Sequence, residues 1–146
     1  MATSDHELIR NTLARYAIGV DFENWDTFSK AFLDDAKITF QAPIGTLSGI
    51  SAIKSTVQAM VGPFQTHHGI TTQLIEITGE TTAEATSYVT TVLSGTGKDE
   101  GKSATISGYY QDKLVKVVVD GEEDWKILER KAFNRGTPTG DLSLSP

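Results

Sequence analysis

The chain has 146 residues, of which 38% are hydrophobic and 22% charged, and this balance predicts a single globular domain with its own core. A net charge of −6 argues against a nucleic-acid-binding protein, since such proteins usually present a basic face. The absence of cysteine excludes disulfides, a thiolate nucleophile and zinc-thiolate sites. No apolar run approaches the ~20 residues of a membrane span, and the first residues are polar, so we expect a cytoplasmic protein.

Three helices are predicted before residue 63. Ser4 and Glu7 form a capping box ahead of the first helix, and Asn24 can cap a short second one. Ser51 is expected to cap the third helix, which ends at Gly62-Pro63. The apolar stripes of these helices recur near the 3.6-residue period. In chain order they are Leu8, Leu13, Tyr16, Ala17 and Val20; Trp25, Phe28, Phe32 and Leu33; and Ile53, Val57, Met60 and Val61.

A short strand is predicted over 36–41, after Asp34-Asp35 ends the second helix. From His67 onward the pattern changes to long β-rich segments that are separated by glycine-containing turns. These segments are 67–78, 82–94, 103–119 and 124–134. Helices followed by long antiparallel strands favour one α+β domain over residues 1–135. The tail over 136–146 contains proline and glycine, and we predict it to be flexible.

Side-chain alternation indicates which face of one strand lines the interior. Between residues 83 and 93 one set is small and apolar, and it suits the inner wall of a curved sheet. This set is Ala83, Ala85, Ser87, Val89, Thr91 and Leu93. Leu93 is therefore a candidate substrate contact. Between 104 and 118 both sets are mixed, so alternation alone leaves the inward face of that strand open.

Several short marks in this order resemble the SnoaL-like group of the nuclear-transport-factor-2-like superfamily, which includes scytalone dehydratase, ketosteroid isomerases and polyketide cyclases. The marks are Arg15-Tyr16-Ala17, Asp21, Asn24-Trp25-Asp26, Gly49, Thr66-His67-His68, Gly108-Tyr109-Tyr110-Gln111-Asp112, Trp125-Lys126-Ile127 and Arg130. The resemblance covers residues 5–135. It implies a cystatin-like cone in which a strongly curved antiparallel sheet and three N-terminal helices enclose a pocket. The same cone also serves proteins without catalytic activity.

The resemblance to scytalone dehydratase places Asp21 at the position of a pocket carboxylate and His68 at one of two histidines. Other positions depart from that enzyme. Its second histidine falls near Gly95, one substrate-orienting tyrosine becomes Phe40, and its pocket asparagine falls near Asp112. We therefore expect a related proton-transfer reaction rather than the same dehydration.

Asp21 and His68 are the candidate acid–base pair. A carboxylate bonded to one imidazole nitrogen fixes the tautomer and makes the other nitrogen a better base. The structural alternative is that Asp21 caps the second helix or meets solvent while His68 is an ordinary strand residue. Tyr16 is the third catalytic candidate, because its hydroxyl could donate a hydrogen bond to an enolate. The alternative is that Tyr16 is a core residue without a catalytic role. His67 is expected on the opposite strand face.

Candidate substrate contacts come from aromatic residues and from the resemblance. Trp25 and Phe40 are core residues by default, but either can stack on a flat substrate. The resemblance directs Tyr110 and Asp112 inward, together with Arg130, and the last two are expected to pair as a structural or catalytic ion pair. A metal site is not expected, because two of the three histidines are adjacent on opposite strand faces. No nicotinamide, flavin or phosphate-binding motif occurs.

These observations predict a cofactor-independent isomerase, cyclase or dehydratase that acts on a small, oxygenated, largely apolar metabolite. The resemblance suggests natural-product biosynthesis, with a polyketide or terpenoid substrate. One alternative is a binding module that holds a ligand or a protein in the same cone without turnover. Another is a cyclase that works mainly by folding its substrate. Proteins with this cone are commonly dimers and sometimes trimers, so the resemblance suggests a homodimer and leaves a trimer open. The expected contact is the outer sheet face with Val115, Val117 and Val119.

Overall fold

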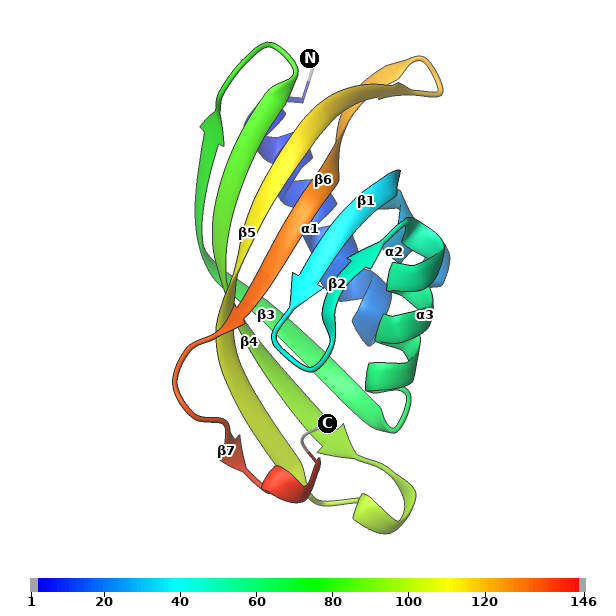
Figure 1. Cartoon of the computed structure of the whole chain (residues 1–146), viewed down its shortest axis with the longest axis vertical. Coiled ribbons are helices and arrows are strands. Elements are labelled where there is room, and N and C mark those ends of the chain that lie inside the picture. The colour runs from blue at the N-terminus through cyan, green and yellow to red at the C-terminus, as the bar shows by residue number, and fades with distance from the viewer. Residues whose placement is uncertain (1–2, 145–146) are drawn as a thin grey trace.

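A computed structural model describes residues 3–144 as three helices packed against one curved sheet (Figure 1). The helices are α1 (Asp5–Asp21), α2 (Trp25–Lys30) and α3 (Ile50–Val61). The strands are β1 (Phe32–Phe40), β2 (Gly45–Ser48), β3 (Phe64–Ile77), β4 (Thr82–Gly95), β5 (Ser103–Val119), β6 (Glu122–Asn134) and β7 (Thr139–Gly140). Two 3₁₀ turns, η1 (Gly97–Asp99) and η2 (Leu142–Leu144), follow β4 and β7.

The sheet has the strand order β2-β1-β6-β5-β4-β3, with β7 added beside β5. All neighbours are antiparallel except β1 and β6, which run parallel, and the sheet does not close into a barrel. The long strands β3 to β6 bend along their length, and this curvature makes the cone (Figure 1). The predicted α+β cone with three N-terminal helices is therefore confirmed. No helix among the described residues has the length and apolar character needed to cross a membrane.

The predicted helix caps hold for the first two helices. The Ser4 side chain accepts a hydrogen bond from the Glu7 amide at 3.2 Å, and Asn24 accepts one from the Thr27 amide at 3.1 Å. The third helix begins two residues earlier than predicted, because Gly49 and not Ser51 is its N-terminal cap, with φ of +87°.

The second helix was predicted to be longer than it is. In the structure α2 ends at Lys30, and Phe32 and Leu33 begin β1 instead of continuing the helical stripe. Phe32 is paired with Ile127 in the parallel β1–β6 ladder, so long-range pairing overrides the local helical period. The predicted strand over 36–41 is the second half of β1. The sequence prediction missed the four-residue β2, whereas the four long strands lie within three residues of their predicted bounds.

Aromatic residues from the first two helices and β1 form the centre of the core. The Tyr16 ring lies 5.2 Å from that of Phe28 and 5.9 Å from that of Phe32. Helices α1 and α2 approach closely beside this cluster, since a Cβ at Gly19 would lie 2.6 Å from the Phe28 backbone nitrogen. Gly19 is therefore required for helix packing and not only for the end of α1.

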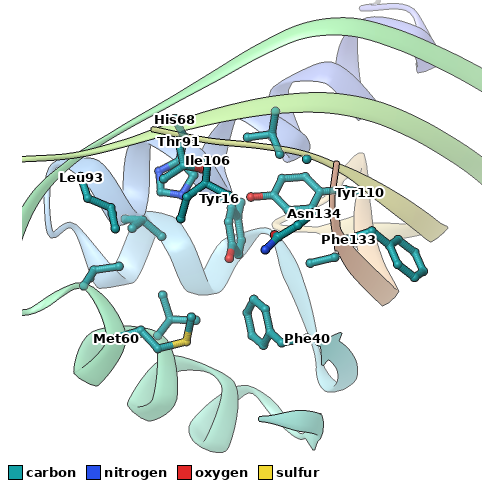
Figure 2. Close-up of a pocket in the computed structure, with 16 residues that line it drawn as sticks. Tyr16, Phe40, Met60, His68, Thr91, Leu93, Ile106, Tyr110, Phe133 and Asn134 are labelled. Carbon is teal, nitrogen blue, oxygen red and sulfur yellow. The ribbon is translucent and has the colours of Figure 1, made fainter. Parts of the chain in front are cut away.

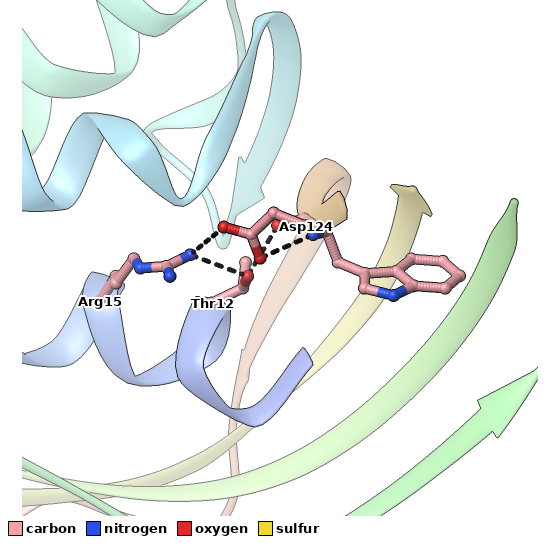
Figure 3. A network of polar contacts seen from close by, with 4 residues as sticks. Thr12, Arg15 and Asp124 are labelled. Carbon is pink, nitrogen blue, oxygen red and sulfur yellow. Dashed lines mark hydrogen bonds and ion pairs between the residues drawn. The ribbon is translucent and has the colours of Figure 1, made fainter. Parts of the chain in front are cut away.

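A polar network fastens α1 to the start of β6 (Figure 3). The buried Thr12 hydroxyl donates to the backbone carbonyl of Trp125 at 2.6 Å. Arg15 Nη1 lies 3.0 Å from Asp124 Oδ2 and 3.3 Å from the Thr12 hydroxyl. Thr12 lies about one helical turn before Tyr16 and Arg15 directly precedes it, so this network sets the position of the part of α1 that carries Tyr16.

The described part of the C-terminal segment lies against the start of β5. Ala104 of β5 is paired with Gly140, and Leu144 is buried. Residues 145–146 lie outside the described residues. The flexibility predicted for 136–146, and a domain boundary at residue 135, stay predictions.

Candidate active site

Asp21 and His68 are in direct contact at the junction of α1 and β3. His68 Nδ1 lies 2.7 Å from Asp21 Oδ1, and the His68 backbone N–H donates to Asp21 Oδ2 at 2.7 Å. The Thr66 hydroxyl donates to Asp21 Oδ1 at 2.8 Å. The carboxylate is thus held by three hydrogen bonds from one strand. Asp21 does not cap α2, because Asn24 does.

The environment of Asp21 favours its charged form. Burial raises the pKa of this carboxyl, but the hydrogen bonds from the His68 ring, the His68 backbone and Thr66 outweigh burial, so the pKa lies below the ordinary value of 3.8. A charged carboxylate selects the tautomer in which His68 Nδ1 carries the proton. The lone pair of His68 Nε2 then remains available to accept a proton.

His68 forms part of the wall of an apolar cavity of about 150 Å³ inside the cone (Figure 2). The remaining lining residues come from α1, β1, α3, β4, β5 and β6. They are Tyr16, Val20, Phe40, Val57, Met60, Val61, Val89, Thr91, Leu93, Ile106, Gly108, Tyr110, Ala132, Phe133 and Asn134. Of the predicted site residues, the wall contains His68, Tyr16, Phe40, Leu93 and Tyr110. Asp21 is not a lining residue, but it contacts the His68 ring.

Tyr16 and Tyr110 lie side by side in this wall. Their ring centroids are 5.7 Å apart, and the Tyr16 ring stands perpendicular to the His68 ring at 6.3 Å (Figure 2). Burial raises the pKa of both phenols, that of Tyr110 more strongly. Both hydroxyls therefore stay protonated at neutral pH, and they are suited to donate hydrogen bonds to an oxygen on a ligand.

The expected ion pair between Asp112 and Arg130 is present and fully buried. Arg130 Nε lies 2.7 Å from Asp112 Oδ1, and Nη2 lies 3.1 Å from Oδ2. Strand β5 therefore turns Tyr110 and Asp112 to the same inner face, which alternation alone had left open.

Three predicted substrate contacts are not among the residues that line the cavity. Asp112 and Arg130 lie outside the lining, next to the two tyrosines. Trp25 packs edge-on against Phe28 at 5.3 Å. Direct contact of these three side chains with a substrate therefore stays a prediction. His67 points to the opposite strand face from His68 and is exposed, as its parity indicates.

The sequence prediction assigned no role to Thr66 or Asn134. Thr66 shares the strand face of His68 and completes the hydrogen bonds to Asp21, and alternation within β3 could have revealed this. Asn134 ends β6 and contributes the only carboxamide in the described cavity wall, for which no local sequence signal exists. Within residues 3–144, no cluster of three or more histidine and acidic side chains could hold a metal ion.

The fold and this site together define a small α+β cone with a carboxylate–imidazole pair at an apolar cavity. The chain belongs to the SnoaL-like domain family, whose family model matches residues 1–131. This membership confirms the resemblance seen in the sequence and places the chain in the nuclear-transport-factor-2-like superfamily.

Solved structures show the same fold at low sequence identity. A proposed scytalone dehydratase from Novosphingobium aromaticivorans is 25% identical, with a TM-score of 0.77 over 92% of this chain and 85% of that one. The hexachlorocyclohexane dehydrochlorinase LinA-type3 from Novosphingobium barchaimii is 20% identical, with a TM-score of 0.75 over 92% and 89%. A proposed aromatic ring hydroxylase from Novosphingobium aromaticivorans is 20% identical, with a TM-score of 0.80 over 97% and 96%. No curated protein matches the chain.

Proposed function

We propose that this protein is a cofactor-free enzyme that moves a proton on a small, oxygenated, largely apolar molecule, in an isomerisation, cyclisation or dehydration. One observation carries the proposal: His68 is bonded through Nδ1 to Asp21 at 2.7 Å while its ring borders an apolar cavity. A base that is oriented by a carboxylate and shielded from bulk water is suited to remove a proton from carbon.

The reaction begins when His68 Nε2 takes a proton from a carbon next to a carbonyl or other activating group. Asp21 stabilises the imidazolium that forms, because its charge lies against the Nδ1 proton. The negative charge that develops on the substrate oxygen accepts a hydrogen bond from Tyr16. Return of the proton from the His68 imidazolium to another carbon completes an isomerisation. If the imidazolium instead protonates a hydroxyl group β to the carbonyl, that group leaves as water and completes a dehydration. Attack of the enolate carbon on a second carbonyl closes a ring, and the alkoxide that forms takes the proton back from the His68 imidazolium.

The cavity limits the substrate. A volume of about 150 Å³ accommodates one small ring, since an apolar cavity of that size holds benzene. Thr91 and Asn134 add polar contacts to an otherwise apolar wall, which suits a ring with one or two oxygen substituents. The names of two of the similar structures, a dehydratase and a dehydrochlorinase, describe eliminations that fit the same first step. A polyketide-like or terpenoid ketone from natural-product biosynthesis is the proposed substrate class.

The test is proton–deuterium exchange and turnover in D₂O on a panel of cyclic polyketide-like and terpenoid ketones. His68→Ala should lower the exchange rate by about 10²–10⁴-fold. His67→Ala is the matched control, because it removes the neighbouring imidazole from the opposite strand face, and it should leave the rate unchanged. Exchange that survives His68→Ala contradicts the proposal. Tight binding of one compound without any exchange supports a binding module, and a rate that depends on cavity shape but not on His68 supports a substrate-folding cyclase.

We also propose a homodimer through the outer face of β5. Val115 and Val117 are half-buried in the single chain and Val119 is exposed, so they form an apolar strip that a second copy can cover. Sedimentation velocity should show a dimer for the native protein and a monomer for Val117→Lys. A native monomer at all concentrations contradicts this proposal.

A further inference from the structure

The guanidinium group of Arg130 is enclosed between the rings of Tyr16 and Tyr110. Its central carbon lies 4.4 Å from the centroid of the Tyr16 ring and 3.9 Å from that of the Tyr110 ring. Its edge is held by the two bonds to Asp112. The four side chains thus form one buried unit, and only its two tyrosines line the cavity.

Stability does not explain why this unit carries charge. Arg130 Nη1 is buried and has no hydrogen-bond partner among the described residues, and an unpaired buried N–H of a charged group is destabilising. Buried ion pairs can often be replaced by apolar residues of similar volume without loss of stability. A charged pair with one unpaired donor therefore suggests a use for the charge itself.

The charge acts on the two tyrosines. Burial raises the pKa of Tyr16, the positive charge of Arg130 lowers it, and the negative charge of Asp112 raises it by less. An interaction between the two hydroxyls lowers the pKa of Tyr16 and raises that of Tyr110. Tyr16 is therefore the more acidic of two protonated phenols, and its hydroxyl points into the cavity (Figure 2).

The planar guanidinium also restricts the two rings. A flat cation can stack against an aromatic face and keep its edge bonded to a carboxylate, which an ammonium group cannot do. The Tyr16 ring therefore contacts the Arg130 guanidinium and also lies near the His68 ring, with 6.3 Å between the Tyr16 and His68 ring centroids. Tyr16 is thus held in one orientation relative to the proposed base.

We propose that Arg130, fixed by Asp112, is a positioning residue that acts through Tyr16: it orients the phenol and strengthens it as hydrogen-bond donor to the substrate oxygen. This inference rests on the proposed acid–base reaction for its catalytic consequence, but the link between Arg130 and Tyr16 does not require a substrate.

The first measurement follows the ionisation of position 16 directly. We would incorporate 3,5-difluorotyrosine there, because its phenol ionises at lower pH than that of tyrosine, and record ¹⁹F NMR spectra against pH. The test variant combines Asp112→Leu with Arg130→Met, so that no single charge is left buried. The matched control combines Glu129→Gln with Lys131→Gln, which removes an ion pair from the neighbouring outward positions of β6. The titration midpoint should rise by about one pH unit in the test variant and stay unchanged in the control.

The second measurement is a double-mutant cycle on the exchange rate. Tyr16→Phe should slow exchange about tenfold or more in the native protein, and less than about threefold in the variant that lacks the Asp112–Arg130 pair. An unchanged ¹⁹F midpoint, or an equal cost of Tyr16→Phe in both backgrounds, overturns the inference. If the test variant does not fold, Arg130→Lys replaces it. Its midpoint should rise because an ammonium group cannot cover both rings, and an unchanged midpoint again overturns the inference.

The two proposals fail in different ways. Exchange that survives His68→Ala refutes the acid–base reaction and leaves the ¹⁹F result intact. Exchange that requires Asp21 and His68, together with an unshifted ¹⁹F titration midpoint, refutes only the role of Arg130.

Discussion

Asp21→Asn gives the sharpest prediction, because the carboxylate has a defined partner for each oxygen. Oδ2 accepts from the His68 backbone N–H, and Oδ1 contacts both His68 Nδ1 and the Thr66 hydroxyl. Asparagine has only one side-chain oxygen, so it can accept at only one of these two places. The His68 backbone N–H can only donate, so the amide oxygen takes the place of Oδ2. The amide NH₂ then takes the place of Oδ1 and faces His68 Nδ1.

This geometry reverses the imidazole tautomer. An NH₂ group donates to His68 Nδ1, so the ring proton moves to Nε2, which can no longer accept a proton from the substrate. The comparable aspartate-to-asparagine change in a serine-protease triad lowers kcat by about 10⁴-fold. We expect a loss of about 10³–10⁴-fold here, with little change in substrate binding, since Asp21 is not in the cavity lining. Loss of the charge-assisted bonds should also lower the free energy of unfolding by about 1–3 kcal/mol.

The assay pairs rate with tautomer. Exchange and turnover would be measured beside ¹⁵N NMR of the His68 ring, which distinguishes protonated from unprotonated ring nitrogens. Thr66→Val is the control, because it removes one bond to the carboxylate without supplying a donor to Nδ1, and it should cost less than about tenfold. If Asp21→Asn keeps the rate within about twofold while the tautomer reverses, the pair is not the proton-transfer unit.

Three further predictions address stability and the cavity. Because folding lowers the pKa of Asp21 below 3.8, its carboxylate stabilises the fold above that pH, and this contribution is lost as the pH falls through the folded-state pKa. Urea unfolding of wild type and Asp21→Asn should therefore converge between about pH 5 and pH 2, and a constant difference contradicts the linkage. Gly19→Ala places a methyl group against the Phe28 backbone and should cost about 1–3 kcal/mol in urea unfolding, whereas Asn11→Ala on the exposed face of α1 should cost little; equal effects refute the close approach. Ala132→Leu narrows the cavity and should lower kcat/KM about tenfold at unchanged thermal stability; unchanged kinetics would mean that chemistry occurs elsewhere.

Local patterns in the sequence were sufficient for much of this fold. The cap at Ser4, the cap at Asn24 and the alternation of β4 depend on neighbours within a few residues, and the structure has each of them. The resemblance supplied the pairing of Asp21 with His68, which no spacing argument could establish across 46 intervening residues. Without it, a helix-end carboxylate and a strand histidine would have remained two unrelated residues.

Tertiary pairing decided what local periodicity could not. Phe32 and Leu33 fit a helical stripe as well as a strand, and only the parallel ladder with β6 assigns them to β1. The bend of the long strands decides which side chains converge, so Thr66 meets Asp21 while Trp25 stays outside the cavity lining. The sequence by itself determined the first helix, the four long strands and the inner face of β4, because these follow from neighbours along the chain. The cavity, the tautomer of His68 and the enclosure of Arg130 arise from contacts between distant residues, and only the folded sheet brings those residues together.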